Sequence, residues 1–283
     1  MKKDPLMITK CPSCSSNVTS LFCTVCGNYL YNYTLTGITK WKAVDIIIPF
    51  IISILVVVTV VIFIILFIGA GFLISFTPNK GFYVNESILI TYVAILISSI
   101  FLSFYLPLFL LTVYLIKKRR SSLKYLGFYK INFKLALLGL SLGGLILFLS
   151  VIYEFLLRYI GIEPPIQIPI PPNIDFQLVK KVLLTLAPLL VFLTGIIGPI
   201  VEELYFRGFL YLFLRKHLKI SHAIIISALI FTILHGFIIL FPMIFISGLL
   251  LVYFYEKYLS LPLVIIAHSV NNTVAVILNI LFL

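Results

Sequence analysis

Long apolar segments separated by short polar stretches dominate the chain from residue 44 onward. An α-helix needs about 20 consecutive apolar residues to cross a bilayer, and several segments reach that length. Full spans are predicted at residues 44–76, 87–116, 133–160, 178–214 and 261–282. Residues 222–256 are predicted to form a helical hairpin of two short spans, broken near Phe241 and Pro242. The pattern therefore predicts an all-α polytopic membrane protein with about seven transmembrane helices, or eight.

The composition excludes most other classes of protein. Of the 283 residues, 62% are hydrophobic and 11% are charged, whereas soluble domains have about 45–50% apolar and about 25% charged residues. A soluble chain could not cover so much apolar surface. A disordered chain would be polar and poor in aromatic residues, and the 25 Phe and 16 Tyr residues of this chain exclude that class as well.

Basic residues are concentrated on one side of the predicted spans, and this explains the net charge of +12. The loop from Lys117 to Lys134 is the richest in them. The opposite side carries only Lys80, Arg158, Lys180 and Lys181. By the positive-inside rule, we expect a multi-pass protein of the plasma membrane or an endomembrane with a cytosolic N-terminus. The lipid bilayer is then the expected partner of these charges, and no nucleic-acid partner is needed to explain the net positive charge.

The four cysteines lie near the N-terminus in the pattern C-x2-C-x8-C-x2-C. They are Cys11, Cys14, Cys23 and Cys26. Two such pairs are typical of tetrahedral thiolate binding of Zn²⁺, and so short a module would depend on the metal to fold. Two disulfides are the alternative, but the predicted cytosolic side is reducing. We therefore predict a structural zinc ribbon in residues 1–30, a linker in 31–43 and a transmembrane domain in 44–283.

Few ionisable residues lie within the apolar segments, where each is costly and therefore suggests a function. Glu154 has Arg158 four residues later, so we expect a local ion pair between them. Arg207 stands four residues after Glu203 and can neutralise it, while Glu202 points about 100° away around the helix. The structural explanation is as good as a catalytic one for Glu203. For Glu202 we favour chemistry.

Two later segments add buried polar side chains at helical spacing. Phe231 and His235 share one helix face, and so do His268 and Asn272. Counted from the predicted inner boundaries, Glu202, His235 and Asn272 lie roughly 15–20 Å deep and His268 roughly 9 Å deep. The four polar residues are therefore expected to converge on one polar cavity in the inner half of the membrane.

One carboxylate, two imidazoles and one carboxamide are sufficient to hydrolyse an amide with water. A general base removes a proton from water, and hydrogen-bond donors stabilise the oxyanion that forms on the carbonyl. The same side chains could instead hold a divalent metal ion, and the sequence leaves both mechanisms open. The H-E-x-x-H motif, the G-x-S-G motif and a mid-span aspartate pair are all absent from the sequence, which argues against other classes of membrane protease.

Three motifs, in this order along the chain, resemble those of the CPBP family. They are Glu202-Glu203-x-x-x-Arg207, Phe231-x-x-x-His235 and His268-x-x-x-Asn272, within a protease core at about 178–283. The family comprises CAAX prenyl proteases of the Ras-converting type and their bacteriocin-processing and immunity relatives. The resemblance implies an all-helical intramembrane endopeptidase in which Glu202 and His235 activate water while His268 and Asn272 stabilise the oxyanion. Glu203, Arg207 and Phe231 would support the site. Since the family has been described both as metal-dependent and as a metal-free glutamate protease, a catalytic metal stays open.

The sequence thus predicts a peptidase that cleaves a membrane-associated protein or peptide reached from the cytosolic side. A prenylated CAAX tail is one substrate option among several. The first alternative is a transporter or ion-binding protein whose buried groups relay protons or bind ions. The second is a membrane adaptor that works through its zinc ribbon, whose own partner the sequence does not identify.

Overall fold

The computed structural model describes Lys10, Ser15 and residues 41–75, 86–119, 123–128, 131–162, 176–236 and 238–282. The predicted zinc ligands Cys11, Cys14, Cys23 and Cys26 lie outside these residues. The zinc ribbon and the linker that follows it therefore stay predictions.

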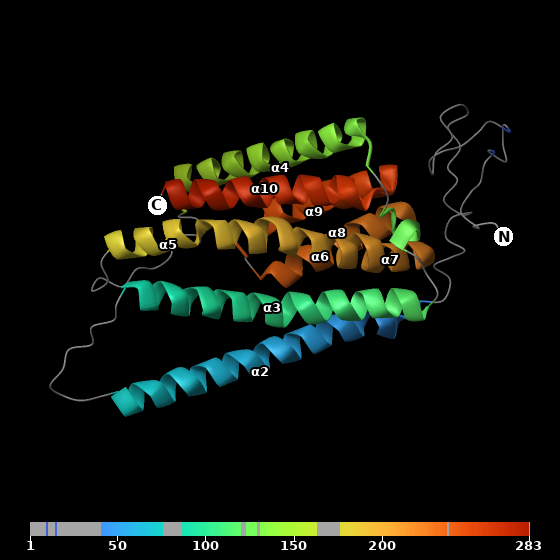
Figure 1. Cartoon of the computed structure of the whole chain (residues 1–283). Helices are drawn as coiled ribbons and strands as arrows, with labels where there is room; N and C mark the ends of the chain where they lie inside the picture. Colours follow the sequence, from blue (N-terminus) through green and yellow to red (C-terminus); the bar gives the residue numbers. More distant parts are fainter. Residues whose placement is uncertain are drawn as a thin grey trace.

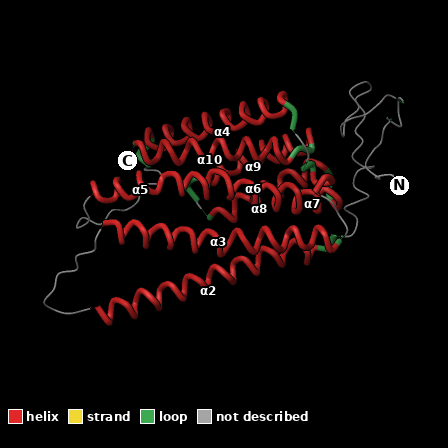
Figure 2. The backbone as a smooth tube through the Cα atoms, viewed as in Figure 1, coloured by secondary structure: helices red, strands yellow, loops and turns green. Residues whose placement is uncertain are grey.

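Every regular element in the described ranges is a helix (Figures 1 and 2). In chain order they are α2 (Ala43–Ser75), α3 (Glu86–Lys118), the 3₁₀ helix η2 (Leu123–Leu126), α4 (Phe133–Tyr159), α5 (Phe176–Leu190), the π-helix η3 (Val191–Ile197), α6 (Gly198–Tyr205), the π-helix η4 (Phe206–Tyr211), α7 (Leu212–His217), α8 (Ile220–His235), α9 (Phe241–Tyr258) and α10 (Leu261–Leu281). The expectation of an all-helical membrane domain is confirmed.

In the described part of the chain, 5 helical segments are long and apolar enough to cross a membrane. They are α2, α3, α4, the continuous rod from α5 to α7, and α10. These segments coincide with the full spans expected from the hydrophobic pattern. The shorter helices α8 and α9 form the expected hairpin. Helix α8 ends at His235 and is capped by Gly236, whose φ of 72° lies in the left-handed region that favours glycine. The structure thus supports 5 spans and a hairpin, and the predicted total of seven or eight is not confirmed.

The helices run side by side along the long axis of the molecule (Figure 1). Helices α2 and α3 pack together, as do α4 and α10 and the two arms of the α8–α9 hairpin. Helix α6 contacts α3 on one side and α10 on the other. The middle of the long rod therefore lies inside the bundle, which is where the sequence has Glu202 and Glu203.

Two glycines bring α4 directly against α10. A Cβ atom at Gly139 would lie 2.8 Å from the carbonyl oxygen of Leu263, and one at Gly143 would lie 2.6 Å from that of Ala267. Small residues four positions apart allow such close helix contacts inside a membrane. The two contacts align Gly139 with Leu263 and Gly143 with Ala267, so the helices run in the same direction in a defined register.

The long rod changes from α-helical to π-helical hydrogen bonding on both sides of α6. The π-helix η3 precedes α6 and the π-helix η4 follows it. Pro199 has no N–H to donate to the carbonyl of Gly195, which interrupts the α-helical bonding at this point. Gly195 also lets η3 lie against α10, because a Cβ there would be 2.4 Å from Oγ1 of Thr273. π-helical segments are frequent at functional sites, and these two flank Glu202 and Glu203.

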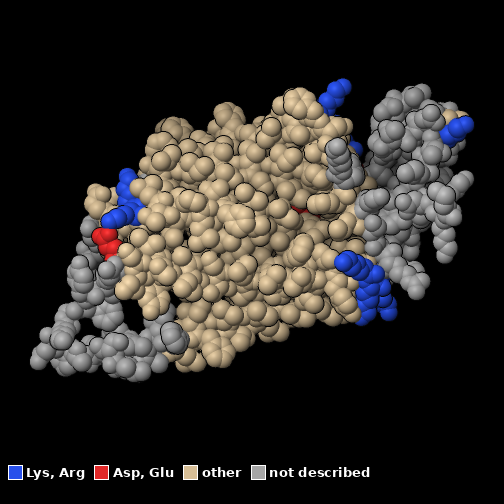
Figure 3. Space-filling view, in the orientation of Figure 1, with Lys and Arg blue, Asp and Glu red and all other residues tan. Residues whose placement is uncertain are grey.

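The outer surface of the bundle is suited to contact with lipid. The charged side chains visible in Figure 3 lie toward the two ends of the molecule, and the surface between them is almost without charge. Large apolar side chains are exposed there, for example Phe63 (70%) and Leu66 (64%) of α2. The structure and the composition together support a multi-pass integral membrane protein. Which end faces the cytosol stays a prediction.

Candidate functional site

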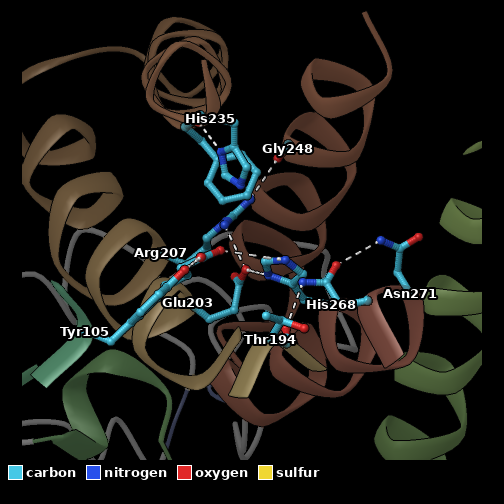
Figure 4. Close-up of polar contacts among 11 residues, drawn as sticks. Tyr105, Thr194, Glu203, Arg207, His235, Gly248, His268 and Asn271 are labelled. Atoms are coloured by element: carbon cyan, nitrogen blue, oxygen red, sulfur yellow. Dashed lines mark hydrogen bonds and ion pairs between the residues drawn. The ribbon is translucent and has the colours of Figure 1, made fainter. Parts of the chain in front are cut away.

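A buried ion-pair network joins α6, η4, α9 and α10 (Figure 4). Oε1 of Glu203 accepts a hydrogen bond from Nη1 of Arg207 at 2.8 Å and lies 2.8 Å from Nδ1 of His268. Arg207 also donates from Nη2 to the carbonyl oxygen of Gly248 at 3.4 Å. The expected pairing of Glu203 with Arg207 is confirmed, and the two side chains are 0% and 1% exposed. Because a carboxylate paired with a guanidinium accepts hydrogen bonds, His268 donates from Nδ1, which fixes the orientation of its ring.

Glu202 has different surroundings from its neighbour. Its Oε1 accepts a hydrogen bond from the hydroxyl of Tyr105 on α3. Its Oε2 is buried without a hydrogen-bond partner in the described part of the chain and lies 3.7 Å from Nε2 of His268. A water molecule placed to one side of these two atoms can hydrogen-bond to both. Tyr105 thus holds one carboxylate oxygen and leaves the other available for proton transfer.

The ring of Phe231 on α8 lies between several polar groups of the site. The guanidinium carbon of Arg207 is 4.3 Å from the ring centroid, a cation–π contact that covers the buried charge. The centroids of the His235 and His268 rings are 4.4 and 5.9 Å from the same ring. Phe231 therefore packs against both imidazoles and excludes water from one face of Arg207.

His235 is the last residue of α8, at the tip of the hairpin. Its Nδ1 lies 2.7 Å from the carbonyl oxygen of Phe231. Since a carbonyl only accepts hydrogen bonds, Nδ1 carries the proton, and a neutral ring has its lone pair on Nε2. His235 can therefore accept a proton or a hydrogen bond on the free edge of its ring.

Two adjacent asparagines of α10 form a chain of amide hydrogen bonds. Nδ2 of Asn272 donates to the carbonyl oxygen of Thr194 at 3.2 Å, and Nδ2 of Asn271 donates to Oδ1 of Asn272 at 3.1 Å. The carbonyl of Thr194 can only accept, so it fixes which end of the Asn272 amide faces Asn271. Asn272 keeps its second N–H for another acceptor, and Asn271 holds the amide in that orientation.

One cavity connects these groups. His235, His268 and Asn272 all line a space of about 270 Å³ between α4, α8, α9 and α10. Glu202 is not part of the lining, but its Oε2 lies 3.7 Å from Nε2 of His268, which is part of it. Along α10 the lining continues to Asn279, near the end of the helix. The cavity therefore extends along α10 from His268 to near the end of the helix.

Glu202 and His268 lie next to each other in the structure. No contact between Glu202 and His235 is recorded among the described residues, and Glu202 lies beside His268 instead. The shallower depth inferred for His268 is wrong, because its ring touches Glu203. That contact requires α10 to begin roughly 10 Å deeper in the bundle than α7 ends. Sequence counting could not supply this offset because it placed both helix ends at the same membrane boundary.

Three residues of the site were missed by reasoning from the sequence: Tyr105, Thr194 and Asn271. Asn271 stands next to a motif residue, and two consecutive amides in an apolar helix are a signal that could have found it. Thr194 contributes only its backbone carbonyl, which has no sequence signal. Tyr105 lies 97 positions before Glu202, and nothing in the sequence connects them.

A catalytic metal stays open, as it did from the sequence. Within the described ranges, no three His, Cys, Asp or Glu side chains are grouped so that they could hold a metal ion. His268 and His235 each use Nδ1 for a hydrogen bond within the protein, so each has only Nε2 left as a donor to metal.

Comparison with protein families supports the motif assignment. Residues 184–274 match the family model described as Type II CAAX prenyl endopeptidase Rce1-like. The matched segment contains all three motifs and therefore supports, at the family level, a CAAX-type intramembrane peptidase. Helices α2, α3 and α4 lie outside the matched segment. Neither the curated proteins nor the solved structures gave a match.

Proposed function

We propose that the chain is an intramembrane endopeptidase that hydrolyses a peptide bond of a membrane-associated protein or peptide with water activated by Glu202. One observation carries the proposal. A buried carboxylate oxygen without a hydrogen-bond partner lies 3.7 Å from an imidazole whose other nitrogen is held by a second carboxylate. The family match over residues 184–274 supports the same reaction class.

In the proposed first step, Oε2 of Glu202 takes a proton from a water molecule beside His268, and the oxygen of that water attacks the carbonyl carbon. Oε1 stays bonded to Tyr105 and keeps the carboxylate in place. His235 offers the lone pair on Nε2 as an acceptor for the second hydrogen of the water. A C–O bond forms, and the electron pair of the carbonyl π-bond moves to oxygen.

The resulting oxyanion needs hydrogen-bond donors. The N–H of Asn272 that is not bonded to Thr194 is one of them. An imidazolium at His268 would donate a second from Nε2. With Glu202 protonated, the charges of Glu203, Arg207 and His268 would sum to +1 and balance the negative charge of the oxyanion. Collapse of the intermediate breaks the C–N bond, and the proton held by Glu202 passes to the leaving nitrogen. The products are a carboxyl group and an amine.

The test is cleavage of a membrane-anchored peptide library by the purified chain in lipid nanodiscs, with products identified by mass spectrometry. We expect cleavage by the wild type and a loss of about 10³-fold in Glu202→Gln, the range typical of a general base. His268→Ala and Asn272→Ala should also be impaired. Undiminished cleavage in all three variants would contradict the proposal. So would a wild-type protein that cleaves no peptide but conducts protons or ions in liposomes.

Glu86→Gln is the matched control for Glu202→Gln. It also removes one negative charge from a helix of the bundle, but Glu86 is paired with Lys181 and is exposed, away from the cavity. We expect it to cleave at the wild-type rate, because a surface ion pair contributes little.

We also propose that the four cysteines bind one structural Zn²⁺ on the cytosolic side of the membrane. The supporting observation is their spacing in the sequence. Elemental analysis of the purified full chain should find about one zinc per chain, and Cys11→Ser should lose it. Disulfide-linked peptides without bound zinc would contradict this assignment.

A further inference from the structure

Glu154 is a carboxylate in the membrane domain for which the proposed reaction has no use. The sequence predicts an ion pair with Arg158, but this prediction is wrong: among the described residues, no hydrogen bond or ion pair of Glu154 is recorded. Arg158 is exposed, whereas Glu154 is half-buried and lines the same cavity as His235 and His268. An ionisable group on a transmembrane helix is costly unless it faces water or a partner.

The packing of α4 against α10 gives the position of Glu154 in the cavity. Gly139 and Gly143 align with Leu263 and Ala267. Continued toward the ends of the two helices, this register brings Glu154 level with Leu278 and its neighbour Asn279, which lines the cavity as well.

The distance along α10 from His268 to Asn279 is roughly 16 Å, from a helical rise of about 1.5 Å per residue. An extended peptide covers that distance in about five residues.

The cavity wall between the two ends is mixed. Ile146 of α4 and Met243, Ile244 and Leu251 of α9 contribute apolar side chains. Asn271 and Asn279 of α10 provide amide groups along the same path. Such a wall accepts apolar side chains of a peptide, and its amides can hydrogen-bond to the peptide backbone. The unpaired carboxylate lies at the far end.

We propose that Glu154 and Asn279 form a distal subsite that binds a cationic group of the substrate, about five residues from the cleaved bond. The proposal rests on the function proposed above, because it takes His268 and Asn272 as the place of cleavage. The substrate class is an apolar peptide segment with a Lys or Arg side chain, or a free amino group, at this distance. Glu154 is a specificity-determining residue and takes no part in the chemistry.

The physical reason is the pairing of charges at this end of the cavity, where Asn279 is exposed and donates from Nδ2 to the carbonyl oxygen of Ala275. A substrate cation that reaches Glu154 restores a counter-charge and gains a charge-assisted hydrogen bond. A neutral residue of similar length leaves the carboxylate unpaired beside apolar walls. A substrate anion at this position would be repelled.

The experiment uses two synthetic apolar peptides of twelve residues with a fluorescent label, one with Lys at its centre and one with Gln. Binding to the full chain in lipid nanodiscs is measured by fluorescence anisotropy in the Glu202→Gln background, where cleavage does not interfere. We expect the Lys peptide to bind about 10-fold more tightly than the Gln peptide, the range of a partly buried charge pair. Glu154→Gln should abolish the difference in binding between the two peptides. Glu154→Lys should instead bind a third peptide, with Glu at its centre, more tightly than the Lys peptide.

Glu86→Gln is again the matched control, because it removes the same charge outside the cavity and should keep the preference for Lys. In the wild type, mass spectrometry should place cleavage about five residues from the Lys, as the register requires. A preference for Lys that persists in Glu154→Gln would overturn the subsite, whether or not the peptides are cleaved. Selective binding through Glu154 without cleavage by the wild type would instead overturn the proposed reaction and leave the cation site standing.

Discussion

The bundle holds two buried centres built from similar residues, and they differ in how many of their polar atoms have hydrogen-bond partners. In the first, Glu256 on α9 accepts a hydrogen bond from the hydroxyl of Tyr211 at 2.6 Å and one from Nε of Arg215 at 3.3 Å. Each oxygen of Glu256 therefore has a partner. In the second centre, three polar atoms have no hydrogen-bond partner among the described residues. They are Oε2 of Glu202, Oε2 of Glu203 and Nε of Arg207.

This difference in hydrogen bonding is the one expected between a structural carboxylate and the general base proposed above. A buried polar group with a partner for each atom stabilises the contact between the helices that supply the partners, here α9 with η4 and α7. A buried oxygen left without a partner costs free energy of folding, so it is retained where the unpaired atom has a use. Glu256 thus stabilises the contact between these helices, whereas the open oxygen of Glu202 is consistent with the proton transfer proposed above.

The largest effect is expected when the same change is made in both centres. Glu202→Gln should lower the cleavage rate by about 10³-fold and leave the thermal unfolding midpoint nearly unchanged, because the amide still accepts from Tyr105. Glu256→Gln should keep the cleavage rate within a few-fold and lower the free energy of unfolding by about 1–3 kcal/mol. Cleavage assays and thermal unfolding of both variants in nanodiscs measure the two effects. The comparison fails if Glu256→Gln abolishes cleavage while Glu202→Gln only lowers the stability.

The next effect concerns the arginine of each centre. Arg207→Met leaves Glu203 buried without its counter-charge, and the expected loss is about 3–5 kcal/mol of folding free energy. Arg215→Met should cost clearly less, because the Arg215 side chain is 12% exposed and Glu256 keeps Tyr211. Thermal unfolding of the two variants provides the measurement. Equal losses of folding free energy in the two variants would show that the centre around Glu203 depends on its arginine no more than the centre around Glu256 does.

A smaller effect is expected from the tyrosine that completes the reactive centre. Tyr105→Phe removes the hydrogen bond to Oε1 of Glu202, and we expect a decrease of about 10-fold in kcat with KM unchanged, because the substrate does not touch this hydroxyl. Tyr114→Phe on the same helix is the control, since Tyr114 is 56% exposed. A decrease confined to KM would assign Tyr105 to substrate binding instead.

The smallest effect tests the amide chain. Asn271→Ala removes the donor that holds Oδ1 of Asn272, and we expect a loss of about 3-fold in kcat, the range of one neutral hydrogen bond. Asn272→Ala should lose far more, because it removes the N–H proposed for the oxyanion. Ser269→Ala on the same helix serves as the control. A rate for Asn271→Ala equal to the wild type would mean that Thr194 alone orients Asn272.

The parts of the site that could be predicted are those encoded in local spacing. The pairing of Glu203 with Arg207 follows from helical geometry over four residues, and so does the contact of Phe231 with His235. The apolar segments and the break of the hairpin follow from hydropathy and length. These features need no knowledge of how the helices pack.

The unpredicted parts depend on contacts between distant helices. Tyr105 reaches Glu202 from α3, outside the segment that matches the family model. Glu154, also outside that segment, was expected to pair with Arg158 within its own helix. It lines the cavity instead, at the end of α4 that follows the close contacts of Gly139 and Gly143 with α10.

The sequence by itself determined that the chain is a helical membrane protein, where its long helices lie, and which few polar residues lie within them. Hydropathy and helical period suffice for this, because a helix satisfies its backbone within its own segment and a bilayer selects its length. The tertiary structure decided which of those polar groups meet. It left one oxygen of Glu202 unpaired beside His268 and turned Glu154 into the cavity. These outcomes depend on the relative depth and register of packed helices, which single segments do not contain.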